Sequence, residues 1–394
     1  MKVHIYFLCL LFVACQSAKG IRRAKQLQKD GYLKTTATTV QMARCCHDDS
    51  VRIHYIGCGG YLIRRGDDAV LIDPYFSNAS VKSLRHLTTD SALVAAFFYE
   101  NFNNALDFPS KSVQNAQNTE GPLTRENIDL LRLNVIKAVL ISHAHHDHLA
   151  DLPYIHQHHL SAPRTTFLGS ETANNILQSF KTPFESSRAF FNLDSLFKQK
   201  RLKNDDFPVR WTSRNQHLRV TAIEAEHAPH FWGMKIPNIG GDVLTVPKHA
   251  PRSTFGFKEG KNYNYLLDFL GENGDIVFRI YSCGGAASRP SVGFLPPSVL
   301  SEKKVDLLIL CGANYDQAVK YPEALLENIQ PERVLVGHWE DFFTPIPSLL
   351  KTPKTVRFTN IPQFLTHIQA EMLKNGNNNA PIMLQPQTPL TIRF

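Results

Sequence analysis

The sequence predicts an α/β (α+β) chain in which two β-sheets pack together between helices. Apolar runs of strand length recur along the 394 residues and are separated by turn-forming residues, which is the pattern of many strands. Two longer stretches, residues 78–128 and 168–207, are compatible with helices. The cysteines beyond residue 15, two of them adjacent, do not have the pattern of a small disulfide-rich protein. Stability must therefore come from a hydrophobic core, and the chain is long enough for one large domain.

The most informative stretch is residues 141–148, with the sequence Ile-Ser-His-Ala-His-His-Asp-His. An apolar run that predicts a buried strand precedes it, and a predicted helix start follows. Side chains alternate in an extended segment, so His143 and His145 lie on the same side and can share one ion. Asp147 and His148 come from the turn beyond, which favours a second ion. Neutral imidazole and carboxylate are the usual ligands of zinc, iron or manganese. The alternative is a solvated histidine-rich loop, but a buried strand does not normally lead into one.

The pattern HxHxDH at residues 143–148 resembles the signature of the metallo-β-lactamase superfamily. Three further elements follow in that family's order: Asp73 at the end of an early strand, His227 after a mid-chain strand and His338 near the C-terminal end. The resemblance covers roughly residues 51–366. It implies the family's four-layer αββα sandwich, in which the two helix-compatible stretches would be variable insertions over a metal cleft.

The resemblance also implies a set of metal ligands. A first ion would take His143, His145 and His227, and a second ion would take Asp147, His148 and His338. Asp73 would hold the ligand loop through hydrogen bonds. Two ions about 3.5–4 Å apart can hold a hydroxide that acts as the nucleophile at neutral pH. We expect one or two Zn²⁺ ions per chain, with another divalent transition metal as the alternative.

The chain departs from the family where a metal-bridging Asp usually follows a strand. Residues 276–285 carry no carboxylate at that strand end, and Cys283 is the nearest candidate ligand. A thiolate there would favour zinc over manganese or magnesium. Alternatively Cys283 is a small buried apolar residue, or it forms a disulfide with Cys58. Without a bridging group the second ion would bind more weakly, so a site with one metal ion stays open.

Several neighbouring histidines need separate interpretations. Either His227 or His230 could be the ligand of the third element; we favour His227 because it comes first after the strand. His230 would then contact the substrate, and we take Asp147 and His230 as the candidate catalytic residues. His146 points away from His145 by alternation and is expected either to contact the ligands from behind or to lie at the rim of the site. Three more histidines are expected on the solvated face of the next helix: His156, His158 and His159.

The amino terminus predicts export. Residues 1–14 have a positive start and a short apolar core, which is typical of a signal peptide rather than a membrane span. The sequence around Cys15 resembles a bacterial lipobox, which implies a lipid anchor on that residue. We therefore expect a membrane lipoprotein of the bacterial cell envelope, with a periplasmic or secreted protein as the alternative.

The domain boundaries follow from these segments. Residues 15–50 are predicted to be a tether or cap, residues 51–370 the catalytic-type domain, and residues 371–394 a C-terminal tail. Within that tail, residues 375–389 contain an Asn run and repeated Pro, which predicts an extended or poorly ordered segment.

Charge and motifs together narrow the function. The net charge is +8 and the pI about 9.0, but Lys and Arg are interspersed and no aromatic-interleaved strand is found, so no nucleic-acid partner is expected. A basic surface suits an anionic envelope or an anionic substrate. The sequence predicts a hydrolase that uses a metal-activated hydroxide on an ester or phosphodiester bond of a lipid or lactone. Within the superfamily, the chain resembles phospholipase-D-like and lactonase-like members more than true β-lactamases. The alternative is a degenerate metal-binding or interaction protein of the same fold without turnover.

Overall fold

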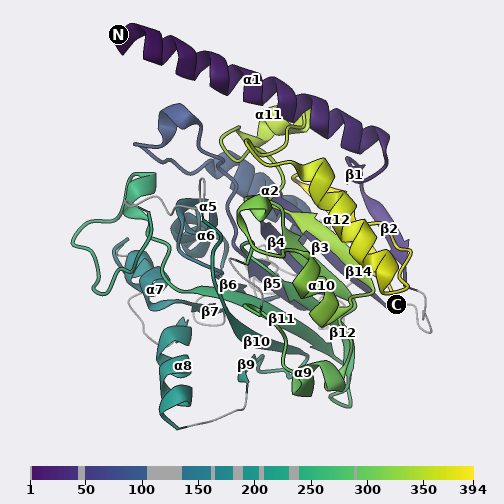
Figure 1. Ribbon diagram of the computed structural model, residues 1–394. Coiled ribbons are helices and arrows are strands. Elements are labelled where there is room, and N and C mark those ends of the chain that lie inside the picture. Colours follow the sequence, from purple (N-terminus) through teal and green to yellow (C-terminus); the bar gives the residue numbers. More distant parts are fainter. Residues whose placement is uncertain are drawn as a thin grey trace.

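Two eight-stranded β-sheets form the centre of the part of the chain that the structure describes (Figure 1). The computed structural model describes residues 2–42, 49–103, 135–160, 165–180, 190–203, 208–229, 239–287 and 291–394. The first sheet has the order β1 (Leu33–Lys34), β15 (Ile382–Leu384), β14 (Arg333–Gly337), β13 (Leu307–Cys311), β12 (Ile276–Ser282), β11 (Asn262–Leu270), β10 (Leu218–Ala225) and β9 (Val209–Thr212). The second sheet has the order β2 (Thr38–Gln41), β16 (Thr388–Arg393), β3 (Ser50–Gly57), β4 (Gly60–Arg65), β5 (Asp68–Ile72), β6 (Ile136–Leu140), β7 (Thr166–Gly169) and β8 (Phe190–Asn192).

Strand direction brings the predicted motifs to one end of each sheet. In the second sheet β5, β6 and β7 are parallel, and in the first sheet β12, β13 and β14 are parallel. Strand β10 is antiparallel to β11, which is antiparallel to β12, so β10 ends at the same edge as β12. Segments that follow parallel strands meet at a common edge, which is where α/β proteins build sites. The residues after β5, β6, β10 and β14 therefore gather together.

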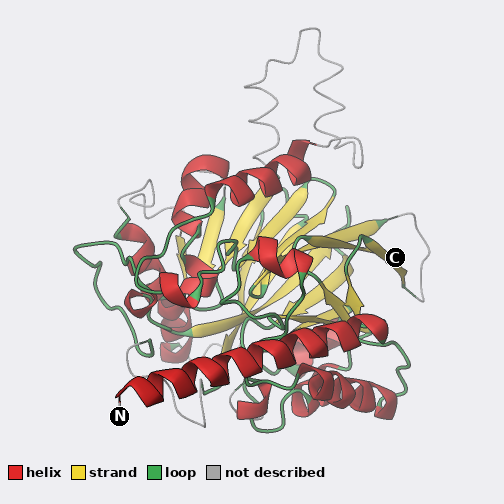
Figure 2. Ribbon diagram, turned by 90° about the horizontal axis from the view of Figure 1, so that it is seen from above, coloured by secondary structure: helices red, strands yellow, loops and turns green. Residues whose placement is uncertain are grey.

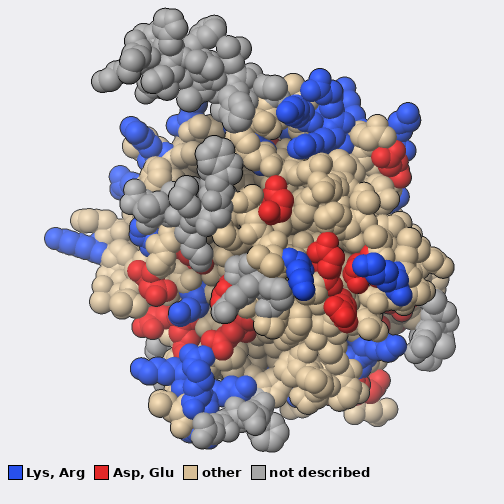
Figure 3. Space-filling view, viewed as in Figure 1, with Lys and Arg blue, Asp and Glu red and all other residues tan. Residues whose placement is uncertain are grey.

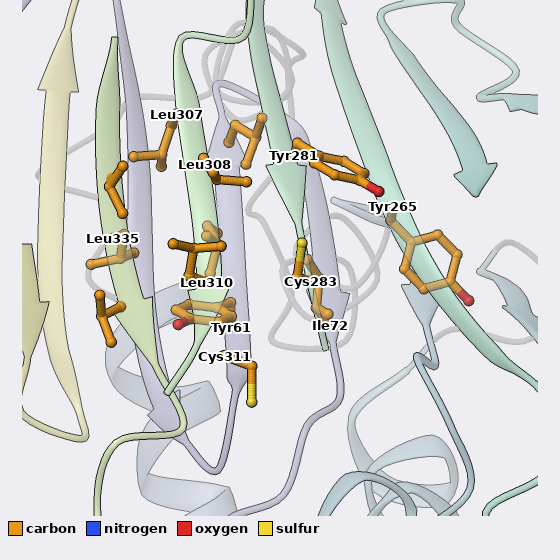
Figure 4. Close-up of a cluster of buried hydrophobic side chains, with 14 of the residues drawn as sticks. Tyr61, Ile72, Tyr265, Tyr281, Cys283, Leu307, Leu308, Leu310, Cys311 and Leu335 are labelled. Carbon is orange, nitrogen blue, oxygen red and sulfur yellow. The ribbon is translucent and has the colours of Figure 1, made fainter. Parts of the chain in front are cut away.

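The second sheet is buried on both faces, because alternate side chains along its strands point into two different cores. In β5, Val70 and Ile72 belong to the core between the two sheets, whereas Ala69 and Leu71 belong to a second core under helices. Strands buried on both faces are continuous apolar runs rather than alternating ones, as this one is. Figure 4 shows side chains of the first core, where Leu307 and Leu308 of the first sheet lie in the same cluster as Ile72.

Helices cover the outer faces and complete four layers (Figure 2). The core under the second sheet is closed by α2 (Ser91–Asn103), α5 (His146–Leu149), α6 (Leu152–His159) and α7 (Glu171–Gln178). The first sheet is accompanied by α9 (Pro297–Glu302), α10 (Glu323–Ile329) and α12 (Ile361–Lys374), whose apolar residues join the main core. The remaining helices are α1 (Lys2–Lys29), α8 (Leu193–Leu202) and α11 (Ile346–Lys351), with 3₁₀ turns η1 (Val81–Ser83), η3 (Thr254–Gly256) and η4 (Tyr315–Gln317). The predicted αββα fold class is confirmed.

The two ends of the chain, predicted as a tether or cap and as a tail, contribute strands to the sheets. The predicted tether, residues 15–50, contributes β1 and β2, and the predicted tail, residues 371–394, contributes β15 and β16. Strand β16 lies between β2 and β3, and its Leu390 and Ile392 are buried. The Asn run, which with the repeated Pro predicted an extended or poorly ordered segment, precedes β15, whereas Pro389 lies within β16 opposite His54. Pairing with β3 and burial of alternate side chains outweigh that composition.

Helix α1 docks on the domain through its C-terminal half. Ala24 and Leu27 are buried, and Arg23 Nη1 donates to the carbonyl of Thr359 at 2.7 Å. A Cβ on Gly20 would lie 2.8 Å from the carbonyl oxygen of Thr355, so only glycine allows this close approach. Lys and Arg side chains gather along this part of the helix (Figure 3). Among the described helices, none combines the length and apolar character needed to cross a bilayer.

A buried ion pair ties the antiparallel strands β11 and β12 together. Asp268 and Arg279 are both fully buried, and Arg279 Nε donates to Asp268 Oδ1 at 2.6 Å. Arg279 Nη1 also donates to the carbonyls of Val299 and Lys303. Arg219 donates to the other carboxylate oxygen of Asp268. The pair is thus fully hydrogen-bonded, the condition under which a buried charge is tolerated.

Replacing Arg279 by methionine should destabilise the protein by about 3 kcal/mol. The value lies at the low end for a broken buried pair because Arg219 still neutralises Asp268. Urea unfolding followed by circular dichroism measures the change. The matched control is Arg201→Met, whose ion pair with Glu224 is exposed on both sides, and it should leave the midpoint nearly unchanged. Equal midpoints for the two variants would contradict the assigned role of the buried pair.

Burial lowers the pKa of His54 from its ordinary value near 6.5 to about 4. Between pH 4 and pH 6.5, His54 is protonated in the unfolded chain but neutral in the folded protein. Stability therefore falls as pH falls from 6.5 to 4, by up to about 1.4 kcal/mol per pH unit from this one group. In the His54→Gln variant, this contribution to the change of unfolding free energy with pH should vanish. The control is His86→Gln, at an exposed position, which should show the same dependence on pH as the wild type. Urea midpoints at stepped pH values test this, and an unchanged slope in His54→Gln refutes it.

Candidate metal centre

Six of the predicted side chains meet at the edge of the sandwich where β5, β6, β10 and β14 end. They form two groups: His143, His145 and His227, and Asp147, His148 and His338. Within each group one potential ligand atom of each residue lies within 4.8 Å of the others, which is close enough to hold a metal ion. The two groups adjoin, since the ring centroids of His143 and His148 are 4.0 Å apart.

Each ring of the first group uses one nitrogen in a hydrogen bond to the protein. His143 Nδ1 donates to Ser142 Oγ at 3.0 Å, because the hydroxyl proton of Ser142 is given to Asp73. His145 Nε2 donates to the carbonyl of Ile239 at 3.3 Å, and His227 Nδ1 donates to the carbonyl of Ala228 at 2.6 Å. A carbonyl can only accept, so these bonds select the tautomer that leaves a lone pair on the other nitrogen. This is the usual arrangement of metal-binding histidines.

His143 Nε2 is the sharpest indication of a missing partner. It is buried and has no hydrogen-bond partner among the described residues. Leaving a buried polar group unsatisfied costs about 1–3 kcal/mol, so such atoms need an explanation. Burial, reinforced by the neighbouring His148, His145 and His227, lowers the pKa of His143 well below its ordinary value. The ring is therefore neutral at physiological pH, as a ligand must be.

In the second group a carboxylate lies between two imidazoles. Asp147 Oδ2 is 3.4 Å from His338 Nε2 and 3.8 Å from His148 Nε2. Burial alone raises the pKa of Asp147, but His148, His146 and His338 outweigh it and hold the pKa well below its usual range. The carboxyl is therefore ionised and can serve as an anionic ligand for a cation. These donors fit a transition metal such as zinc.

Asp73 holds both groups in place. Its Oδ1 accepts from the backbone N–H of Ser142 at 2.8 Å, and its Oδ2 accepts from Ser142 Oγ at 2.5 Å. The same Oδ2 lies 3.0 Å from His148 Nδ1. The backbone of Asp73 is left-handed, with φ of 41°. One buried carboxylate thus bonds to Ser142, the hydrogen-bond partner of His143, and also lies beside His148.

Glu340 is a supporting residue that sequence reasoning missed. It is fully buried and accepts from Tyr55 Oη at 2.5 Å and from the backbone N–H of Cys58 at 2.5 Å. Tyr55 Oη in turn accepts from the backbone N–H of His338 at 2.9 Å, where the backbone is left-handed with φ of 49°. The sequence did contain a signal for this residue: Glu340 is a carboxylate only two residues after the candidate ligand His338, in Gly-His-Trp-Glu-Asp.

Cys283 belongs to neither group, which corrects its prediction as a ligand. It lies in the main hydrophobic core with Cys311 and Tyr281, and burial raises the pKa of its thiol. Side chains alternate along β12, so Cys283 shares the face of Tyr281. Gly284 lies on the side of the site instead: a Cβ there would come within 2.1 Å of Ser142 Cβ. Cys283 and Cys58 are both free, so the alternative disulfide does not form either.

The other histidines have mixed outcomes. His230 lies outside the described residues. His146 is partly buried, with Nδ1 3.6 Å from Asp147 Oδ1. On α6, His158 is exposed as expected, but His156 is buried and its ring packs against Phe167 at 5.2 Å. That part of the prediction was wrong because the short helix turns the face of His156 toward the second core.

One family model matches the part of the chain that carries the HxHxDH segment. Residues 107–241 match the model of a family described as the Beta-lactamase superfamily domain, and this range includes the 143–148 motif and His227. The chain is similar to that domain over about a third of its length. No curated protein has significant similarity to the sequence.

Solved structures with a related arrangement have low identity to the chain. They include Igni18, a metallo hydrolase from Ignicoccus hospitalis, at 12% identity and a TM-score of 0.44, with 88% of this chain and 99% of that chain covered. The metallo-beta-lactamase fold protein YhfI from Bacillus subtilis has 12% identity and a TM-score of 0.38, with 87% and 99% covered. The isothiocyanate hydrolase from Delia radicum gut bacteria has 10% identity and a TM-score of 0.41, with 86% and 98% covered. Similarity at these values carries no argument about the substrate.

Replacing Asp73 by asparagine should lower zinc affinity about 10–100-fold, because such supporting hydrogen bonds orient the ligands. The asparagine amide has the same shape as the carboxylate, but one of its two terminal atoms is an NH₂ group. This donor would face the N–H or O–H of Ser142, which are also donors, so one hydrogen bond would be lost. Competition titration with a zinc-binding dye measures the affinity, and circular dichroism checks that the variant folds. Asp30→Asn, at the exposed end of α1, serves as the control. Wild-type affinity in a folded Asp73→Asn variant would contradict the role.

Proposed function

We propose that this protein is a metal-dependent hydrolase. The observation that carries the proposal is the set of three imidazoles, His143, His145 and His227, each hydrogen-bonded to the protein through one nitrogen and each with a potential ligand atom within 4.8 Å of the others. A histidine triad with neutral rings is the ligand set of catalytic zinc sites. The match of residues 107–241 to the Beta-lactamase superfamily domain supports the same reading.

Zinc is the proposed ion, with the first group as the stronger site. A divalent ion bound there supplies Lewis-acid polarisation of the scissile bond and makes water a nucleophile near neutral pH. Asp147, His148 and His338 form the proposed second site. Asp147 is the only carboxylate in the two groups, so the second site lacks an additional anionic bridge and should bind its ion more weakly. The donor set is thus compatible with one ion or two per chain.

The chain's own residues provide positioning and proton handling. Asp147 is ionised and can accept a proton from an incoming water, and it is also a ligand candidate. His227 forms part of the wall of a cavity of about 790 Å³, and Lys261 and Glu226 line the same cavity. That size suits a small molecule or a lipid head group. His230, next to this wall in sequence, remains our candidate for contact with the substrate.

We propose an ester or phosphodiester of a lipid, or a lactone, as the substrate, as in phospholipase-D-like and lactonase-like proteins. The glycine-rich hairpin between β3 and β4 and the Gly-His-Trp-Glu-Asp segment after β14 support this subtype over a true β-lactamase. Gly59 in that hairpin borders the site, since a Cβ on it would lie 3.7 Å from His338 Cβ.

We also propose that the protein is a lipoprotein of a bacterial envelope, anchored at Cys15. Cys15 lies within α1, and the residues that dock this helix, Gly20, Arg23, Ala24 and Leu27, all follow it. Cleavage before Cys15 would therefore leave the docking half of α1 intact. Mass analysis of the mature N-terminus tests the anchor, and an unmodified residue 15 rejects it.

A metal-binding protein without turnover is the second candidate. The position of Gly284, where a side chain would displace Ser142, favours it, because this strand end offers no carboxylate to the site. Zinc content measured together with activity on phosphodiester, ester, lactone and β-lactam reporters separates the two functions. Bound zinc with no turnover on any reporter would favour the second candidate.

Replacing His145 by alanine should abolish zinc uptake and turnover together, since it removes one of three ligands of the stronger site. Elemental analysis of the purified protein and the reporter panel measure the two effects. The matched control is His158→Ala, which removes an exposed imidazole from α6 and should change neither. Full activity of folded His145→Ala would rule out the proposed mechanism.

A further inference from the structure

The segment 239–260, here called the 239–260 loop, leaves the metal site and returns to it. At its roots the N–H of Glu259 donates to the carbonyl of Ile239 at 2.8 Å, and the N–H of Gly260 donates to the carbonyl of Gly241 at 2.9 Å. The same Ile239 carbonyl accepts from His145 Nε2, and the carbonyl of Glu259 accepts from the N–H of Ala144. Both roots are thus bonded to the HxHxDH segment.

The loop is also fixed along its length. Val243 N–H donates to Thr172 Oγ1 at 3.0 Å, and the carbonyl of Val243 accepts from Asn175 Nδ2 at 2.8 Å, which ties the loop to α7. Farther on, Phe257 is buried in the second core.

A second segment, residues 81–87, lies alongside the loop. The N–H of Leu87 donates to the carbonyl of Arg252 at 2.8 Å, and the N–H of Thr254 donates to the carbonyl of Leu84 at 2.9 Å. The 239–260 loop and residues 81–87 therefore form one continuous surface, here called the loop surface.

The loop surface exposes large apolar side chains. Leu244 is 74% exposed, Phe255 49%, Val246 46% and Val81 52%. Isolated exposed apolar residues are ordinary, but four of them on two bonded segments indicate an interaction surface. Because the segments are tied down, these side chains are held at the surface and do not fold back into a core.

The charges of the loop surface are mostly positive. The exposed cations are Lys82, Arg85, Lys248 and Arg252, and the exposed carboxylate is Asp242. Apolar side chains among Lys and Arg are the composition of surfaces that bind anionic lipid, because the apolar groups enter the interface while the cations remain with the head groups. On the face drawn in Figure 3, the left edge of the molecule shows Lys and Arg beside uncharged surface.

The loop surface projects to the same side as the start of α1. In Figures 1 and 2 the N-terminal end of α1 and the 239–260 loop both extend beyond the body of the sandwich on the left. Cys15, the proposed lipid anchor, lies within α1 ahead of the residues that dock this helix on the domain. A membrane that met the amino terminus on this side would be within reach of the loop surface.

We propose that the loop surface docks on an anionic phospholipid membrane. Leu244, Val246 and Phe255 enter the interface, and Lys248 and Arg252 pair with lipid phosphates. Docking there brings the HxHxDH segment, to which both roots are bonded, next to the lipid surface. The proposal concerns binding and does not depend on hydrolysis.

Insertion of the loop is tested with Phe255→Trp in the full chain. On vesicles of phosphatidylcholine with phosphatidylglycerol, the introduced indole should shift its emission to shorter wavelengths and be quenched by brominated lipid. The control is Leu373→Trp, at a site 51% exposed on α12, which should respond no more than the wild-type background. No binding to these vesicles, or binding in which Phe255→Trp responds like the control, would overturn the proposal.

The contribution of the apolar and cationic side chains to vesicle affinity is measured by vesicle co-sedimentation. The triple variant Leu244→Ser, Val246→Ser, Phe255→Ser should lower vesicle affinity about tenfold or more, because apolar burial dominates interfacial binding. Lys248→Glu with Arg252→Glu should remove the preference for anionic over neutral vesicles, and raised salt should do the same to the wild type. The control replaces Leu202, Val319 and Leu373 by serine and should bind like the wild type. A triple loop variant that binds as tightly as this control contradicts the proposal, and zinc content checks that the metal site is intact.

Discussion

The metal centre depends on one buried carboxylate. Asp73 accepts two hydrogen bonds from Ser142 and lies against His148, so a single side chain sets the path of the ligand loop and the orientation of a ring in each group. Its own position is determined by β5, whose last residue, Ile72, is locked in the core between the sheets. Gly284, which follows β12 of the opposite sheet, lies so close to this loop that a Cβ on it would come within 2.1 Å of Ser142 Cβ. Any substitution that moves Asp73 therefore acts on both ligand groups together.

The hydrogen bonds of the imidazoles explain why the site suits a cation. His143, His145 and His227 each donate to a hydroxyl or carbonyl, and one potential ligand atom of each ring lies within 4.8 Å of the others. Without a cation this arrangement is costly, because a buried acceptor such as His143 Nε2 is left unsatisfied. The ionised Asp147 adds the negative charge that a divalent ion needs. Geometry and charge thus favour the same kind of ligand.

The metal site is connected to the core of the sheets on one side and to the loop surface on the other. The main core contains buried side chains of both sheets. The buried Asp268–Arg279 pair joins β11 to β12 a few residues before Gly284. From the ligand loop, backbone hydrogen bonds continue into the 239–260 loop and then to residues 81–87. Packing and backbone hydrogen bonds therefore connect the interior, the metal ligands and the apolar basic surface proposed to meet lipid.

The sequence by itself predicted the fold class and seven of the side chains that gather at the site. The HxHxDH spacing, the single histidines after β10 and β14, and the carboxylate after β5 are local patterns at strand ends, and the parallel edge of each sheet brings such ends together. Only the tertiary structure decided the place of Cys283, because the phase of alternation in β12 is set by pairing with β11 and β13. It also decided the role of Glu340, whose partners Tyr55 and Cys58 are far away in sequence. The C-terminal strands were missed because their short apolar runs gain stability from strand pairing rather than from local preference. Local chemistry can be recognised in a sequence, whereas register and long-range hydrogen bonds exist only once the sheets have formed.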